Sequence, residues 1–222
     1  MGRKRVELSE IHPYHICARS NNRTWFELPL SQVFEIYANH MEKTILKYQI
    51  ECHAFVLMAN HFHMLISTPT SNLSQAMRYF MTETSREIAR ACSRINRIYG
   101  RRYHWTIIRT AEHYAHAYSY VYRNPIHHNA VQGLEQYSCS SLTEKNKNFS
   151  RLIVDKKQGY DAYIPHCRRE LISWLESNKD QEYDAAISRC LKHHEFLFPQ
   201  DRITGKRNTY FDKLHPQKTP GT

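Results

Sequence analysis

Strand-like and helix-like segments alternate in a definite order along residues 14–123 of this chain of 222. Short runs rich in β-branched and aromatic residues predict strands, and apolar residues at helical spacing predict helices. In chain order we expect a strand at 14–19, a helix at 31–46, strands at 50–58 and 62–67, a helix at 74–98 closed by Gly100, a strand at 103–109, and a helix at 111–123 stopped by Asn124-Pro125.

This order predicts an α+β protein. A β-α-β-β-α-β order followed by a helix is the ferredoxin-like arrangement, in which two helices cover one face of an antiparallel sheet and leave the other face free for an active site. We therefore expect a catalytic domain at 1–141, ending with the helix that carries the chemistry. A mostly helical extension follows at 142–222, with a polar linker at 143–148, helices around 167–177 and 183–198, and a mobile tail after Pro199.

The charge balance narrows the class of partner. Lys and Arg number 31 against 21 Asp and Glu, a net charge of +10, and nucleic acid is the commonest partner for such a surplus. We find neither an apolar run long enough to span a membrane nor a signal peptide. The six cysteines lie far apart and predict free thiols. We expect a soluble cytoplasmic protein.

Two histidines stand two residues apart in the second half of a predicted hairpin. Side chains alternate along a strand, so His61 and His63 point to the same face while Phe62 and Met64 point into the core. Two imidazoles side by side are candidate metal ligands. In a chain with 15 histidines, a chance pair of surface side chains is the competing explanation.

A tyrosine-rich helix supplies a second set of candidates. Four helical residues turn the chain by about 400°, so Tyr120 and Asn124 lie roughly 40° apart on one face, which His116 shares. A tyrosine can attack a phosphodiester, but a phenol with a pKa near 10 is mostly protonated and needs a phosphate activated by a metal. Packing of this helix on the sheet is the alternative role for Tyr120.

These pieces together resemble a known family. Residues from about 14 to 141 resemble the IS200-like transposases, single-strand DNA enzymes of the HUH (His-hydrophobic-His) nuclease class, and within them the REP-associated tyrosine transposases. The resemblance is carried by the order and spacing of segments 14–23, 58–66, 108–109, 120–125, 133–137 and 140–141. Two positions depart from the family pattern: Ala59 stands where proline is common, and Cys139 where tryptophan is common.

The resemblance implies a fold and a mechanism. It implies the ferredoxin-like fold, with Mg²⁺ or Mn²⁺ on His61 and His63. Tyr120 matches the nucleophile and Asn124 the third protein ligand, for which His116 is an alternative; Tyr122 lies about 200° round the helix and cannot share that position. The implied reaction is cleavage and rejoining of single-stranded DNA through a 5′-phosphotyrosine, at hairpin (REP-like) or palindromic ends. The implied location is the bacterial cytoplasm, on the nucleoid when bound to DNA.

Arginines near the predicted site are candidates for gripping this DNA. They are Arg19, Arg23, Arg78, Arg101, Arg102, Arg109 and Arg123. Nearby aromatic residues at 103–105 are candidates for stacking on bases, although Trp105 also suits the core.

Two other functions remain open from the sequence. One is a domesticated hairpin-DNA-binding protein without cleavage activity. The other is a metal-dependent phosphoesterase that uses water as the nucleophile and forms no covalent protein–DNA product. The target sequence, and the choice between monomer and homodimer, are also undecided.

Overall fold

A computed structural model describes residues 5–143, 147–154, 156–177 and 181–198. Within this part of the chain, four strands form one sheet in the order β2-β3-β1-β4, and every pairing in it is antiparallel. The strands are β1 (Tyr14–Arg19), β2 (Glu51–Leu57), β3 (His61–Ser67) and β4 (His104–Ile107). This strand order and its connections confirm the ferredoxin-like prediction.

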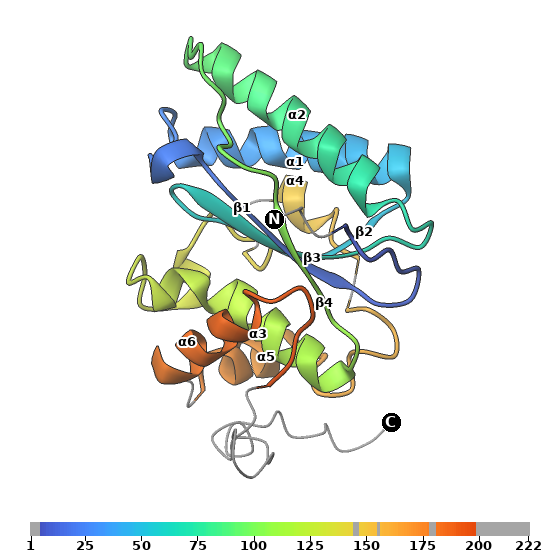
Figure 1. The fold of residues 1–222 in the computed structure, drawn as a ribbon. Helices are drawn as coiled ribbons and strands as arrows, with labels where there is room; N and C mark the ends of the chain where they lie inside the picture. Colours follow the sequence, from blue (N-terminus) through green and yellow to red (C-terminus); the bar gives the residue numbers. More distant parts are fainter. Residues whose placement is uncertain (1–4, 144–146, 155, 178–180, 199–222) are drawn as a thin grey trace, which may run out of the picture.

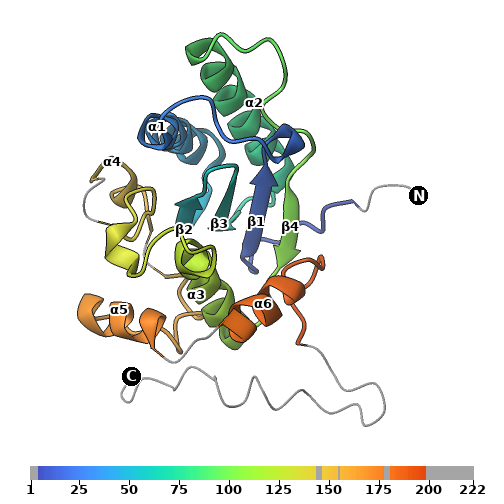
Figure 2. The same cartoon turned by 90° about the vertical axis from the view of Figure 1, so that its left-hand side faces the viewer.

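Helices cover both faces of the sheet (Figures 1 and 2). On one face lie α1 (Leu30–Tyr48) and α2 (Leu73–Ala91), and on the other lie α3 (Ala111–His127), α5 (Arg168–Glu176) and α6 (Gln181–Cys190). Three short helices complete the described elements: η1 (Asn21–Arg23), η2 (Leu134–Gln136) and α4 (Lys147–Ser150), which lies beside α1. The second face, expected to be free, is therefore covered by α3 and the extension.

Strand alternation divides the apolar side chains between two cores. Phe62, Met64 and Ile66 of β3 pack toward α1 and α2. Leu65 packs on the other side with side chains from α3, α5 and α6, among them Leu171. Because His61 and His63 share the alternation of Leu65, they face this second core. Described residues beyond 141 contribute to that core; the domain boundary at 141 stays a prediction.

The α2 helix ends earlier than predicted, at Ala91. The following segment turns back against η1, where Asn21 N donates to Ile98 O at 2.7 Å. A Cβ on Gly100 would lie 2.7 Å from Asn21 Oδ1 and 3.2 Å from its Cα. Glycine at 100 thus allows the close approach of this segment to η1 and does not close a helix.

The α3 helix continues through Pro125 to His127, whereas the sequence predicted a stop before it. Proline removes one intrahelical N–H, and the next bonds continue, with His128 N donating to Asn124 O at 3.1 Å. Every residue of α3 from Tyr114 to Pro125 is buried, so packing on both sides outweighs the lost bond.

The end of the described chain also differs from the prediction. The helix expected at 183–198 stops at Cys190, and residues 193–196 then run along β4. Ile107 N donates to His194 O at 2.9 Å, and Phe196 N donates to Ile107 O at 3.0 Å, which covers an otherwise open sheet edge. The tail after Pro199 and linker residues 144–146 lie outside the described residues. None of the described helices combines the length and apolar character that a membrane span needs.

Candidate active site

The two predicted histidines lie together at the start of β3. The rings of His61 and His63 are 5.0 Å apart between centroids and nearly perpendicular. Each residue is only 6% exposed, so the pair sits under α3 and not on an open sheet surface. The pair is therefore enclosed, where a bound group would be shielded from water.

Asn60 orients the ring of His61. The Asn60 Nδ2 donates to Arg23 O at 2.9 Å, which turns its Oδ1 toward His61 Nδ1, 2.7 Å away. An amide oxygen only accepts, so His61 carries its proton on Nδ1 and keeps the Nε2 lone pair free for a ligand. The buried Nε2 makes no hydrogen bond of good geometry to the described residues.

His15 supports the second histidine from β1. Its Nε2 lies 2.9 Å from His63 Nδ1, and the two rings stack at 5.1 Å. Neither His15 nor Asn60 was among the site residues predicted from the sequence. The signal that could have found His15 was strand alternation. His15 and Arg19 lie on the same face of β1, and the register pairs β1 with β3, which carries the two histidines.

Burial keeps these imidazoles neutral. Together with the charge of Arg19, it lowers the pKa of His61 to about 4. Burial also lowers the pKa of His63 well below 6.5, with His61 and His15 acting in the same direction, and lowers that of His15 to about 3. Neutral imidazole is the form that binds a metal ion.

The α3 helix brings Tyr120 to the histidines. Its ring lies 5.5 Å from that of His63, and its hydroxyl donates to Ser188 Oγ of α6 at 3.3 Å. Burial raises the pKa of Tyr120, so the phenol is protonated at neutral pH. Tyr122 points elsewhere: its hydroxyl lies 3.1 Å from Ser141 Oγ. The structure thus brings Tyr120 to the histidines, as the predicted helix register requires.

Asn124 lies between the two halves of the site. Burial has the largest effect on the pKa of both His61 and Tyr120. Against that effect, the Asn124 carboxamide raises the pKa of His61 and lowers the pKa of Tyr120. Its Oδ1 and Nδ2 are buried and make no hydrogen bond of good geometry to the described residues. His116, the alternative ligand, instead lies with its Nδ1 2.6 Å from the Tyr183 hydroxyl.

The donors that meet here suit a hard or borderline divalent cation. Two neutral imidazole nitrogens and one amide oxygen face a common region, and two of the three groups have buried polar atoms that make no hydrogen bond of good geometry to the described residues. Across those residues, no three His, Cys, Asp or Glu side chains group closely enough to hold a metal. An ion at this site would therefore depend on Asn124 and on water as well as the histidines.

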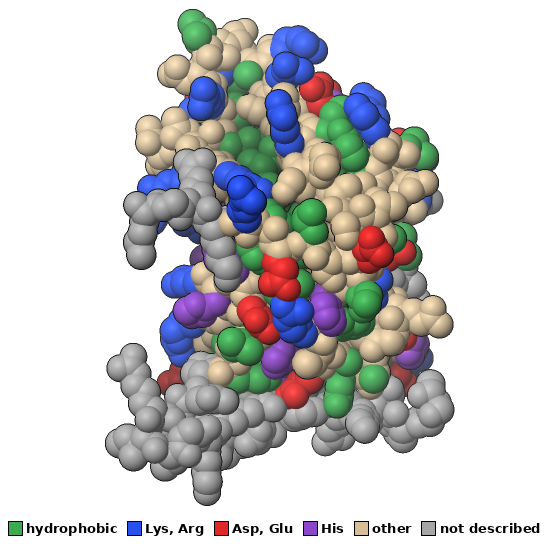
Figure 3. Space-filling model, turned by 45° about the vertical axis from the view of Figure 1, so that its right-hand side comes forward, with side chains coloured by type: hydrophobic (Ala, Val, Ile, Leu, Met, Phe, Trp, Pro, Cys, Tyr) green, Lys and Arg blue, Asp and Glu red, His purple; other side chains and the backbone are tan. Residues whose placement is uncertain are grey.

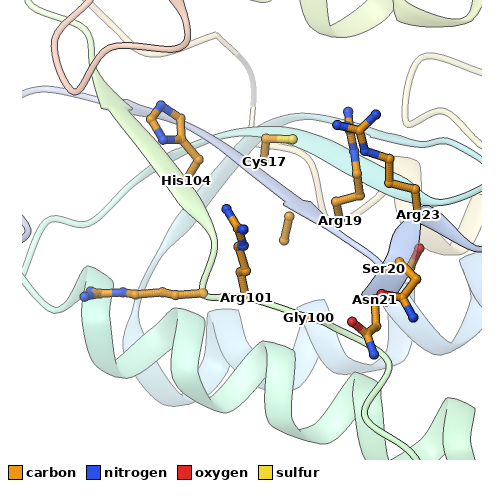
Figure 4. A pocket seen from close by; sticks show the side chains of 11 residues that line it. Cys17, Arg19, Ser20, Asn21, Arg23, Gly100, Arg101 and His104 are labelled. Carbon is orange, nitrogen blue, oxygen red and sulfur yellow. The ribbon is translucent and has the colours of Figure 1, made fainter. Parts of the chain in front are cut away.

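A basic pocket lies at the end of β1, the strand next to the histidine pair (Figure 4). It has a volume of about 540 Å³ and lies between the end of β1, η1 and the segment before β4. Its lining includes Arg19, Arg23, Arg101 and Arg102 and no acidic side chain. Cys17 and Arg19 also line it, and their β3 partners in the sheet are His63 and His61. The pocket therefore lies against the strand next to the histidines, and its basic lining suits phosphate groups.

The remaining three predicted arginines lie elsewhere. Arg109 is ion-paired with Glu7 and Glu195. Arg78 is exposed on α2, across the sheet from the site. Arg123 is only 3% exposed and forms a bidentate pair with Asp184, so its guanidinium does not face a DNA phosphate in this arrangement, contrary to expectation.

Two exposed residues near the site were missed. The ring of His128, one turn after Asn124, lies 5.8 Å from that of His61. Trp25 follows η1 and is 75% exposed, whereas Tyr103 and Trp105, proposed for stacking, are buried. Figure 3 shows Lys and Arg gathered over the upper part of one face, the part that contains α1 and α2. The exposure of an aromatic side chain, which decides whether it can stack on a base, cannot be predicted from the local sequence.

Comparison with known proteins identifies the family to which the chain belongs. A family model described as "Transposase IS200 like" matches residues 9–129. A Haemophilus influenzae protein assigned as a REP-associated tyrosine transposase is 24% identical over 124 residues, covering 51% of this chain and 70% of the relative. The structure of a REP-associated tyrosine transposase bound to a REP hairpin shares the fold, with a TM-score of 0.54 and 20% identity over 64% of this chain and 82% of that one. Since the family match spans more than half of the sequence, including the whole sheet and α3, the chain belongs to the IS200-like transposase family.

Proposed function

We propose that this chain is a metal-dependent single-stranded DNA endonuclease and strand transferase that forms a 5′-phosphotyrosine on Tyr120. One observation carries the proposal: the Tyr120 ring lies 5.5 Å from His63, while Asn124 of the same helix lies beside His61. A nucleophile on α3 and metal donors on β3 therefore converge at one enclosed place.

The metal ligands and the nucleophile have separate roles. His61, His63 and Asn124 would hold Mg²⁺ or Mn²⁺, which when bound draws charge from the oxygens of the scissile phosphate. Tyr120 supplies the attacking oxygen. Because burial raises the pKa of Tyr120, the attack depends on an activated phosphate and not on a pre-existing phenolate.

The proposed reaction exchanges one phosphodiester for another. Tyr120 Oη attacks phosphorus in line, so that an Oη–P bond forms while the P–O3′ bond breaks. The phenolic proton passes to water, and the departing 3′ oxygen takes a proton from water. The products are a 5′-phosphotyrosine and a free 3′-OH. Attack of a 3′-OH on this link restores a phosphodiester and the phenol, so joining needs no ATP.

The pocket beside the histidines supports a single-stranded substrate. Arg19, Arg23 and Arg101 of its lining can contact the phosphates of an unpaired strand, and the exposed Trp25, which follows η1, offers an indole face to a base. The structural relative is bound to a REP hairpin. We therefore propose hairpin DNA with an unpaired flank as the substrate.

A covalent-trapping assay tests the proposal. The protein is incubated with labelled hairpin DNA carrying single-stranded flanks and Mn²⁺ or Mg²⁺, then separated under denaturing conditions. We expect a slow-migrating protein–DNA band that Tyr120→Phe and EDTA abolish. Tyr122→Phe is the matched control, because its hydroxyl contacts Ser141 and not the histidines.

Other outcomes separate the competing functions. Cleavage without a covalent band would indicate a water nucleophile and a phosphoesterase. Binding that weakens with salt, with neither cleavage nor a band, would indicate a hairpin-binding protein. A band lost only in Tyr122→Phe would refute the assignment of Tyr120.

A further inference from the structure

The extension reaches the proposed nucleophile through α6. Three successive contacts join α6 to α3: Tyr183 with His116, Asp184 with Arg123, and Ser188 with Tyr120. Tyr183 and Asp184 begin this contact face, and Ser188 lies one turn after Asp184 on the same side. Figure 2 shows α6 beside α3 on the face of the sheet that carries the site.

A buried ion pair fixes the position of α6. Arg123 Nε and Nη2 donate to the two carboxylate oxygens of Asp184 at 3.0 and 2.8 Å, and Arg123 Nη1 donates to Leu175 O at 2.8 Å. Arg123 directly precedes Asn124 in α3. The Arg123–Asp184 bonds therefore fix the position and rotation of α6 relative to the proposed site.

Ser188 then sets the direction of the phenolic hydrogen. The Tyr120 hydroxyl donates to Ser188 Oγ at 3.3 Å. A phenol oxygen that donates on one side presents its lone pairs on the other, and Asn124, which also acts on Tyr120, is in the proposed ligand set. A hydroxyl that instead rotated freely would spend less time with a lone pair toward the phosphate.

We propose that Ser188 is a positioning residue of the active site, supplied by the C-terminal extension, which holds the Tyr120 hydroxyl for in-line attack. This inference rests on the proposed function of Tyr120. It gives α6 a role in the reaction itself, beyond packing on α3.

The test compares Ser188→Ala with Ser188→Thr, which keeps the hydroxyl. Ser173→Ala is the matched control, because Ser173 is exposed on α5. Three quantities are measured on the full-length protein: the single-turnover rate of covalent complex formation at saturating hairpin DNA, the Kd for that DNA, and the Tm. Loss of one hydrogen bond in the transition state predicts a rate about three- to tenfold lower in Ser188→Ala.

The expected pattern separates positioning from structure. Ser188→Ala should slow the covalent step while its Kd and Tm match those of the wild type, and Ser188→Thr should recover most of the rate. An unchanged or faster rate in Ser188→Ala would overturn the inference, and a faster rate would show that α6 restrains Tyr120. A parallel loss of Tm and rate that Thr does not rescue would also overturn it. If the wild type forms no covalent complex, the proposed function fails first.

Discussion

Removing Asp184 should destabilise the whole protein, because it leaves the Arg123 charge buried without its carboxylate. The two side chains are only 4% and 2% exposed, and their pair is bidentate. Truncating one partner of such a pair costs about 3–5 kcal/mol, whereas an exposed pair contributes at most about 1 kcal/mol. For a chain of this size, that loss corresponds to a fall in Tm of roughly 6–20 °C.

Urea unfolding of Asp184→Ala, followed by circular dichroism, measures this cost. Glu83→Ala is the control, because the Arg86–Glu83 pair is exposed on α2 and should matter little. A double variant, Arg123→Met with Asp184→Leu, removes both charges and should recover most of the loss. If Asp184→Ala cost no more than Glu83→Ala, the ion pair would not anchor α6, and the reasoning about the extension would be refuted.

Two further predictions concern DNA binding and pH. Arg101→Ala should weaken binding of single-stranded DNA and reduce the slope of log K against log salt by about 0.7, while Trp25→Ala should weaken it by about 1–3 kcal/mol without changing the slope; Arg78→Ala, on the far helix layer, should match the wild type in fluorescence anisotropy at several salt concentrations. Equal losses in all three variants would contradict the assignment of the pocket. The pKa values of about 3 for His15 and about 4 for His61, both below 6.5, mean that the unfolded chain gains protons first as the pH falls below about 6.5. The free energy of unfolding should therefore decrease toward pH 4, by up to about 1.4 kcal/mol per pH unit for each histidine. His15→Gln should have a shallower slope in urea unfolding at pH 7.0 to 4.5, and exposed His166→Gln should not; identical slopes would refute the prediction.

The strands of the sheet and the faces of their side chains could be predicted because their determinants are local. Alternation in 61–66 separates the histidines from Phe62 and Met64, and the strand order follows from the order of elements. The helical spacing of Tyr120 and Asn124 likewise depends only on helix geometry, so their shared face was predictable.

The parts that failed depend on tertiary contacts. Proline tends to stop an isolated helix. The α3 helix, however, is packed between the sheet and α6, and it continues past Pro125 to His127. From the local sequence, Arg123 is expected to be a surface charge, because its partner Asp184 lies 61 residues later in the chain. Neither partner is visible in the local sequence, because burial is decided by segments far apart in the chain.

The packing of α5 and α6 on α3 links the C-terminal extension to the proposed site. The proposed metal donors lie on β3 and α3, and the proposed nucleophile lies on α3, so the geometry of the site depends on how α3 sits over the sheet. The sheet supports one side of α3, and α5 and α6 support the other, with Leu171 and Ile187 in the same core as Val121. Without residues 168–190, that side of α3 would face water and Tyr120 would lose Ser188. We therefore expect the extension to contribute to both the position of the helix and the orientation of its hydroxyl.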